Sequence, residues 1–227
     1  MQSALFESCK GYMQAHSNRA AKEQARPLPT IVISRETGAG ALTIGQKIVE
    51  ITHGKGRNSV PWAVFDRNLV ERVIEDHHLP KTIKQFMPED VRFELTSAVE
   101  ELLGLHPDSW TLLEHTADTI LRLAAAGHAV IVGRGANIIT ARLKNVLHVR
   151  LIAPIEDRIQ RIQKSHSLTA REAAIFVQKM DRSRHRYVKR YFNADIDEPL
   201  NYQLILNSGA LGDQETARII ADAALHI

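Results

Sequence analysis

The chain has 227 residues, of which 44% are hydrophobic and 24% charged, and its formal net charge is +3. These values are typical of a folded globular protein and exclude an intrinsically disordered chain. A single cysteine, Cys9, excludes an intrachain disulfide framework, and no apolar run reaches the roughly 20 residues that cross a bilayer. The N-terminus lacks the basic and then apolar layout of a secretory signal, so we expect a cytoplasmic protein without a membrane partner.

Apolar periodicity predicts an N-terminal arm followed by alternating strands and helices. The arm, residues 1–28, has helical spacing and ends at two prolines, Pro27 and Pro29; we expect it to pack on the domain or on a second subunit, which leaves a homodimer through the arm open. The predicted strands are Thr30–Ser34, Trp62–Phe65, His128–Val132, Val146–Ala153 and Tyr202–Asn207. The predicted helices are Leu42–Ile51, Arg67–His77, Pro88–Ala126 with a break near Gly104, Pro154–Lys164, Thr169–Arg190 and Asp213–Ala224.

Five short apolar strands separated by helices predict an α/β fold, in which a five-stranded parallel sheet carries helices on both faces. Ligands of such sheets bind beyond the carboxyl ends of the strands. In this sequence several candidate binding and catalytic residues come directly after predicted strands. They are Arg35 to Gly40, Asp66, Gly133 to Gly135 and the turn at Ala153.

The turn after the first strand carries the clearest sign of function. Its glycines allow the backbone to turn tightly and to direct N–H groups inward, and the following helix adds partial positive charge, which suits a phosphate. A standard phosphate loop also has a lysine after its last glycine and a nearby hydroxyl for Mg²⁺. Here Ala41 takes the lysine position, Thr43 keeps the hydroxyl, and Arg35 is the nearest cation that offers a substitute. An ordinary glycine turn without a ligand is the alternative. The candidate phosphate-binding residues are Thr37, Gly38, Ala39, Gly40, Ala41, Leu42 and Thr43.

Positive charge is concentrated in the second half of the chain. Between Arg158 and Arg190 ten residues are Lys or Arg, whereas only Glu172 and Asp181 are acidic. This excess favours an anionic ligand at the segment. The net charge of the whole chain is too small to indicate nucleic acid by itself.

Four stretches of the sequence resemble the cytidylate kinase-like family. They read I-V-I-S-R-E-T-G-A-G, V-I-V-G-R-G-A, D-R-S-R-H-R-Y and N-Y-Q-L-I-L-N, and they stand in the expected order over roughly residues 30–226. The resemblance implies a P-loop nucleoside monophosphate kinase-like fold for residues 29–227. It further implies a helical acceptor-binding insertion at roughly 62–126 and a lid with the basic helix at roughly 154–192.

The resemblance also implies site residues, with ATP and Mg²⁺ as cofactors at the glycine turn. Asp66 and Arg72 match the ends of the family motif D-S-G-x-x-Y-R. Gly133 and Arg134 match G-R-D, but Gly135 replaces its aspartate, so the carboxylate that reads an exocyclic amine such as that of cytosine is missing. The catalytic candidates are Arg35, Arg134, Arg158, Arg182 and Arg184. The candidates for binding the acceptor are Asp66, Arg72, Arg134 and Asp181, with Thr43 on the magnesium side.

Phosphoryl transfer needs little beyond these groups, because an acceptor phosphate is already an anionic nucleophile and arginines bind phosphate oxygens bidentately. The leading hypothesis is therefore ATP-dependent phosphoryl transfer to a nucleoside monophosphate or another small phosphorylated acceptor. One alternative is a nucleotide-binding regulatory protein that lost catalysis together with the lysine at Ala41. A second is a nucleic-acid-binding module that uses the basic helix of residues 169–190 and its aromatic residues. Each arginine has a simpler explanation as part of a solvated helix face.

Overall fold

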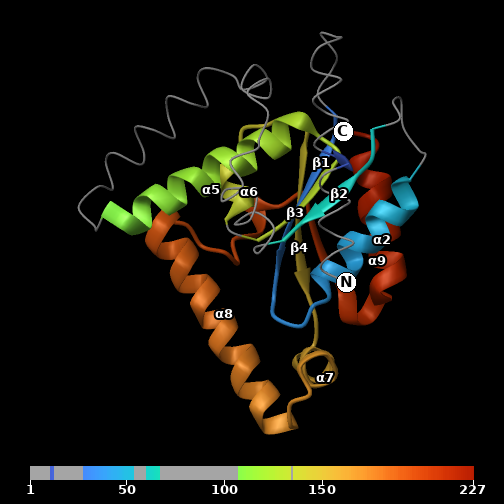
Figure 1. Ribbon diagram of the computed structural model, residues 1–227. Helices are drawn as coiled ribbons and strands as arrows, with labels where there is room; N and C mark the ends of the chain where they lie inside the picture. The colour runs from blue at the N-terminus through green and yellow to red at the C-terminus, as the bar shows by residue number, and fades with distance from the viewer. Residues whose placement is uncertain (1–10, 13–27, 54–59, 67–106, 134) are drawn as a thin grey trace.

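Five strands form one parallel sheet in the order β2-β3-β1-β4-β5, with β1 at its centre (Figure 1). The structure is a computed structural model that describes residues 11–12, 28–53, 60–66, 107–133 and 135–227. The predicted five-stranded parallel sheet is confirmed. The strands are β1 (Thr30–Arg35), β2 (Ala63–Phe65), β3 (Ala129–Val132), β4 (Val146–Ile152) and β5 (Leu204–Asn207).

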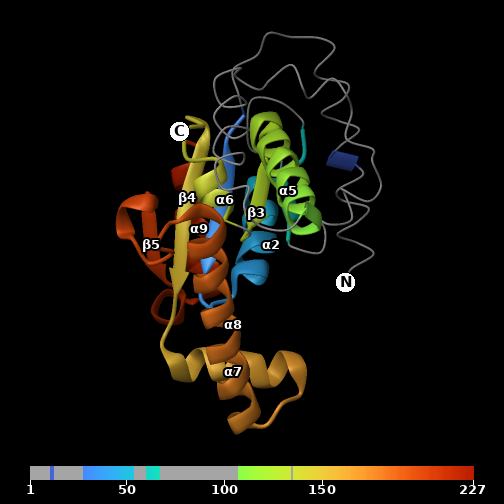
Figure 2. The same cartoon turned by 90° about the vertical axis from the view of Figure 1, so that its left-hand side faces the viewer.

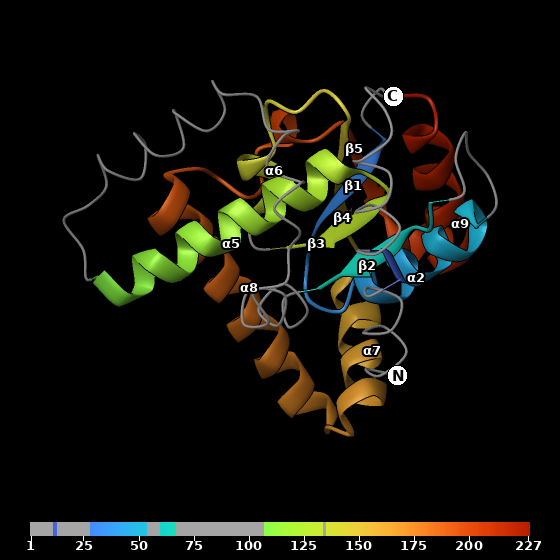
Figure 3. The ribbon, with the colours of Figure 1, turned by 45° about the horizontal axis from the view of Figure 1, so that its top comes forward.

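Helices cover both faces of the sheet, with α2 and α9 packed together on one face and α5 and α6 on the other (Figure 3). The helices are α2 (Ala41–Thr52), α5 (Pro107–Ala126), α6 (Ala136–Ile139), α7 (Ile155–His166), α8 (Ala170–Phe192), the short 3₁₀ helix η2 (Pro199–Asn201) and α9 (Ser208–Ala224). None of the helices described is both long and apolar enough to cross a membrane.

The element boundaries differ from the predicted ones mainly near the C-terminus. The last strand begins at Leu204 instead of Tyr202, because Tyr202 ends η2. The last helix begins five residues before the predicted Asp213, because the Asn207 side chain accepts a hydrogen bond from the N–H of Ala210 and caps an extra turn. The arm, apart from Gly11, Tyr12 and Leu28, and the predicted helices at 67–77 and 88–106 lie outside the described residues.

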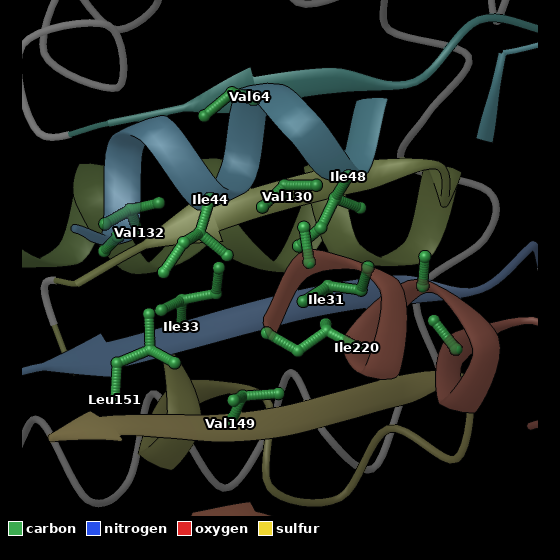
Figure 4. Packing of buried hydrophobic residues seen from close by; sticks show 14 of the residues in the cluster. Ile31, Ile33, Ile44, Ile48, Val64, Val130, Val132, Val149, Leu151 and Ile220 are labelled. Carbon is green, nitrogen blue, oxygen red and sulfur yellow. The ribbon is translucent and has the colours of Figure 1, made fainter. Parts of the chain in front are cut away.

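The larger of two apolar cores lies between the sheet and the pair α2 and α9 (Figure 4). Ile44 and Ile48 stand one turn apart on α2, so both side chains face the sheet, and both are fully buried. Burial of each such side chain stabilises the folded state by ~1.5–3 kcal/mol. Between them Gly45 brings the helix close to the sheet, since a Cβ there would lie 3.3 Å from the side chain of Val64.

The second core lies under α5, where Ile120 and Leu123 pack toward Phe65 of β2. Tyr12 from the N-terminal segment joins this core. Its ring packs edge-on against Phe65 at 5.2 Å, and its hydroxyl donates a hydrogen bond of 2.5 Å to the carbonyl of Gly127. At this position the N-terminal segment therefore packs on the chain's own domain.

A hairpin of α7 and α8 projects from the edge of the sheet where the strands end (Figure 2). A small apolar cluster of Ile162, Ala173 and Val177 holds the two helices together. α8 begins with a capping box, in which Thr169 and Glu172 satisfy each other's backbone N–H groups. The sequence therefore specifies a separate, well-defined hairpin next to the turn that follows β1.

Candidate functional site

The glycine turn, residues 35–40, leads from the central strand into α2. Gly38 and Gly40 have φ values of +84° and +81°, a left-handed conformation that glycine adopts without strain. Among the residues that the structure describes, no side chain caps α2, and the first turn of this helix holds no acidic residue. The partial positive charge of this helix end is therefore available to an anion.

Asp181 of α8 binds directly to the glycine turn. One carboxylate oxygen accepts hydrogen bonds of 2.8 Å from both the backbone N–H and the hydroxyl of Thr37. The other oxygen accepts a bond of 2.6 Å from Arg158 of α7, and Arg184 of α8 donates to both Asp181 and Thr37. Because an oxyanion of the protein already binds these donors, the turn has the chemistry to hold an oxyanion of a ligand.

Arg158 contacts the turn from the α7 side. A Cβ on Gly38 would lie 2.5 Å from the carbonyl oxygen of Arg158, so only glycine fits at this contact. The Arg158 side chain also lies 3.5 Å from the carboxylate of Glu36, which accepts a 3.0 Å hydrogen bond from the N–H of Ala153. These contacts fix the start of α7 against the glycine turn.

The protonation states at this cluster follow from its contacts. Burial raises the pKa of Asp181, but the hydrogen bonds from Thr37 and Arg158 and the charge of Arg184 outweigh it, and the pKa lies below its ordinary value. Burial lowers the pKa of Arg184, against the opposing effect of Asp181. The carboxylate is therefore ionised at neutral pH and offsets part of the positive charge around it.

A second polar network lies beside the first, at the ends of β1 and β4. Arg150, a buried residue of β4, donates hydrogen bonds of 2.9 Å to the hydroxyl of Ser34 and 2.5 Å to the carboxylate of Asp197. The other oxygen of Asp197 lies 2.6 Å from Nε2 of His185, whose Nδ1 lies 2.8 Å from the carbonyl oxygen of Asp181. Tyr202 donates to Ser34 at 3.2 Å. The network links the end of β1 to α8.

The structure brings together some of the predicted site residues. Arg158, Asp181 and Arg184 converge on Thr37, and Thr43 is exposed in the first turn of α2. Exposed Arg182 lies along α8, in a pocket of about 630 Å³. The pocket is lined by Ile155, Arg158, Val177, Gln178, Asp181, Arg182, His185 and Arg186.

Other predicted residues lie elsewhere at the same edge or outside the described residues. The guanidinium of Arg35 lies against Gly133, at the turn after β3, and Asp66 follows β2. Arg72 and Arg134 lie outside the described residues, so their assignment to the acceptor stays a prediction. Within the part of the chain that the structure describes, no group of three or more His, Cys, Asp or Glu side chains is arranged to hold a metal ion.

Sequence reasoning missed the second network and one further ion pair. Arg161 of α7 and Asp213 of α9 form a bidentate pair, with both nitrogen–oxygen distances at 2.8 Å, directly beside Gly40. A charged residue inside the apolar strand V-L-H-V-R-L-I was a usable signal for Arg150. Asp197 and Asp213 gave no such signal, because their partners are 47 and 52 positions away in the sequence.

A parallel sheet, a glycine turn after its central strand and a helical hairpin at the same edge define a P-loop kinase-like fold. The sequence comparison agrees with this class. The model of the cytidylate kinase-like family matches residues 30–210, and the chain belongs to this family. No curated protein matches the sequence.

Solved structures resemble the chain in fold. The crystal structure of an uncharacterized protein from Eubacterium ventriosum ATCC 27560 matches with a TM-score of 0.66 at 17% identity, over 88% of this chain and 99% of the other. A gluconokinase from Sinorhizobium meliloti 1021 has a TM-score of 0.46 at 15% identity, over 89% and 94%. A shikimate kinase from Bacteroides thetaiotaomicron has a TM-score of 0.44 at 15% identity, over 87% and 94%. At such low identity the likeness to the first structure establishes the fold alone.

Proposed function

We propose that the chain transfers the terminal phosphoryl group of ATP to a nucleoside monophosphate or another small phosphorylated acceptor. The observation that carries the proposal is the glycine turn, where an uncapped helix end meets arginines from α7 and α8. Membership of the cytidylate kinase-like family supports the same reaction class. The donor phosphates would lie against residues 37–43, between the turn and the hairpin.

The chemistry requires positioning and charge neutralisation. An oxygen of the acceptor phosphate attacks the terminal phosphorus of ATP, and the bond from that phosphorus to the bridging oxygen breaks with its electron pair leaving on ADP. No strong general base is needed, because the attacking oxygen already carries negative charge. Bound with the nucleotide, Mg²⁺ supplies further neutralisation of the phosphate charge. Arg158 and Arg184 would neutralise charge on the transferred group as the hairpin closes on it.

The acceptor would bind between the ends of β2 and β3, where Asp66 and Arg134 follow their strands. Gly135 lies at the position where the family motif has an aspartate. A Cβ at Gly135 would lie 2.4 Å from the ring of Phe192, and the residue has φ +69°. The aromatic ring therefore fills the space that a side chain at Gly135 would need, so we do not expect this position to read a cytosine amine.

A nucleotide-binding regulator is the second candidate, and the alanine at position 41 favours it. Ala41 is buried, with 7% of its surface exposed, and it brings no charge to the phosphates. Such a regulator would bind Mg-ATP without transferring a phosphoryl group.

One experiment separates the two candidates. The purified protein is incubated with Mg-ATP and each common nucleoside monophosphate, CMP first, and the products are separated by chromatography. ADP together with a matching diphosphate establishes the kinase and names its acceptor, and Arg184→Ala or Arg134→Ala then lowers turnover by about tenfold or more. Stabilisation of the protein by Mg-ATP without any product supports the regulator instead.

A further inference from the structure

The glycine turn lacks the cation that a phosphate loop normally places after its last glycine. In the standard motif this lysine reaches the terminal phosphates of the bound nucleotide. Ala41 has no charge to offer, and its side chain packs in the core between α2, α9 and the sheet. A chain that binds a nucleoside triphosphate at this turn needs positive charge from another part of the fold.

Arg161 brings a guanidinium to the position next to Ala41. It follows Arg158 by three residues on α7, so both side chains leave the helix on the same side. A Cβ built on Gly40 would lie 2.6 Å from Nη1 of Arg161 and 3.0 Å from its Cζ. The guanidinium therefore lies against the backbone of the residue that precedes Ala41, at the N-terminus of α2.

Asp213 holds this guanidinium in place. Both terminal nitrogens of Arg161 donate hydrogen bonds of 2.8 Å to the two oxygens of Asp213, and one of those oxygens would lie 3.0 Å from a Cβ on Gly40. The bidentate pair uses two of the five N–H donors of a guanidinium, which leaves three for a ligand. The Arg161 side chain is 37% exposed, so a phosphate can approach it from solvent.

The other arginines near the turn have different positions. Arg158 and Arg184 bind Asp181 near Thr37, which precedes Gly38, whereas Arg161 lies at Gly40, which follows it. Arg35, which the sequence suggested as the substitute for the lysine, has its guanidinium against Gly133, at the turn after β3. Among the described arginines, Arg161 is thus the one that lies against the last glycine of the turn.

We propose that Arg161, positioned by Asp213, supplies at the N-terminus of α2 the charge that a lysine supplies in the standard phosphate loop, and that it binds the terminal phosphate of the donor. The inference rests on the proposed function for the transfer step. Binding of the triphosphate by Arg161 does not require that the protein catalyse phosphoryl transfer.

A charge-neutral double variant, Arg161→Gln with Asp213→Asn, tests the proposal. Both replacements keep hydrogen-bonding groups, leave no carboxylate unpaired and preserve the net charge of the chain. The matched control is Arg218→Gln with Asp222→Asn on α9. It removes an exposed pair whose nitrogen–oxygen distance is 3.1 Å, together with the exposed contact of Arg218 with Glu215. Calorimetry measures the Kd of each protein for Mg-ATP and for Mg-ADP, and steady-state assays measure kcat and KM where product forms.

The double variant is expected to bind Mg-ATP about tenfold more weakly or worse, because a charge-assisted hydrogen bond to the terminal phosphate is lost. Mg-ADP, which lacks that phosphate, is expected to lose less affinity, and a merely structural role for Arg161 would affect both nucleotides equally. The control variant is expected to bind both as the unaltered protein does.

Three outcomes overturn the proposal or separate it from the proposed function. Mg-ATP affinity of the double variant within about twofold of the unaltered protein refutes the role of Arg161, whatever the turnover. If the unaltered protein binds Mg-ATP but phosphorylates no acceptor, the proposed function fails and the Kd comparison still decides on Arg161. Absence of Mg-ATP binding by the unaltered protein refutes both. If circular dichroism shows that the double variant is unfolded, Arg161→Met is measured in its place against the same two outcomes.

Discussion

The carboxylate of Asp181 lies 2.8 Å from the backbone nitrogen of Thr37, although the two residues are 144 positions apart in the sequence. The contact joins the helical hairpin to the glycine turn at the end of the central strand. It also places a negative group of the protein on a donor that we expect a nucleotide phosphate to approach. The position of α8 is therefore coupled, through the Asp181 side chain, to whether the Thr37 N–H binds this carboxylate or a phosphate.

Asp181→Ala is expected to destabilise the protein by about 2 kcal/mol, because Arg158 and Arg184 lose their shared, half-buried carboxylate. Asp181→Asn is expected to cost less, since the amide oxygen still accepts from Thr37. Urea unfolding measures both. Asp222→Ala removes the carboxylate of an exposed ion pair within α9 with Arg218, and as a control it is expected to change stability by no more than about 0.5 kcal/mol.

Gly38→Ala is expected to weaken nucleotide binding beyond its effect on stability. Gly38 has φ +84°, and a Cβ would lie 2.5 Å from the backbone oxygen of Arg158, so the turn must shift. Gly127→Ala is a matched control, with φ +81° and a Cβ 2.4 Å from the backbone oxygen of Leu28 at the opposite edge of the sheet. Both variants are expected to melt at lower temperature, but only Gly38→Ala is expected to lose the stabilisation by Mg-ATP. Equal stabilisation in the two would contradict a phosphate site at Gly38.

Arg150→Met is expected to lower stability by about 2 kcal/mol, because the buried hydroxyl of Ser34 loses a donor and Asp197 loses one of its two partners. For a chain of this size the loss corresponds to a decrease in melting temperature of about 5 °C. Differential scanning calorimetry measures it. Arg218→Met, at an exposed arginine with two ion pairs, serves as the control and is expected to melt like the unaltered protein. A similar melting temperature for both variants would show that the network around Arg150 does not stabilise the fold.

The stability that His185 provides is expected to fall as pH rises. Its two ring nitrogens face a carbonyl oxygen and a carboxylate oxygen, both acceptors, so the imidazole must carry two protons to donate both bonds. Burial lowers the pKa of His185, but the hydrogen bonds to Asp181 and Asp197 outweigh it and raise the pKa above 6.5. The contribution of a group with a raised pKa is complete below the unfolded value and is lost as pH rises through the folded value.

The margin of stability of the unaltered protein over His185→Gln is therefore expected to be larger at about pH 5.5 than at about pH 8.5. Urea unfolding at both values measures the margin. The same substitution made in the Asp197→Asn background is expected to depend less on pH, since the carboxylate partner is gone. A margin that grows with pH would contradict the proposed protonation of His185.

Much of the fold could be predicted from the sequence, because its signals are local. The apolar runs that became β1 and β4 are bounded by turn residues, and the paired isoleucines at 44 and 48 mark the buried side of α2. The four-residue helix α6 was missed, since it is too short for a helical period to be visible. The early start of α9 depends on the capping side chain of Asn207. Asn207 is also the last residue of β5, and the sequence pattern predicts only this second role.

The candidate site could be predicted only in part. The glycines of the turn and Arg184 stand in motifs, Arg158 begins the basic segment, and these parts do meet in the structure. Asp181, which binds Arg158 and Arg184, stands in the same motif as Arg184. The carboxylates that position Arg150 and Arg161 are not visible in this way. Asp197 and Asp213 become partners of Arg150 and Arg161 only through tertiary contact, and a single sequence holds no record of such pairs.

The break in α9 at Gly212 limits which insertions and deletions the start of this helix can tolerate. Gly212 has φ 74° and ψ 161°, so the helix stops there and starts again. Asp213, which lies beside Gly40, comes five positions after Ser208, whose hydroxyl donates a hydrogen bond to the carbonyl of Ala39. In an unbroken helix two residues at this spacing would point about 140° apart, away from a common target. The break turns both toward one loop, so adding or deleting a single residue between them would separate the C-terminal helix from the glycine turn while leaving every strand intact.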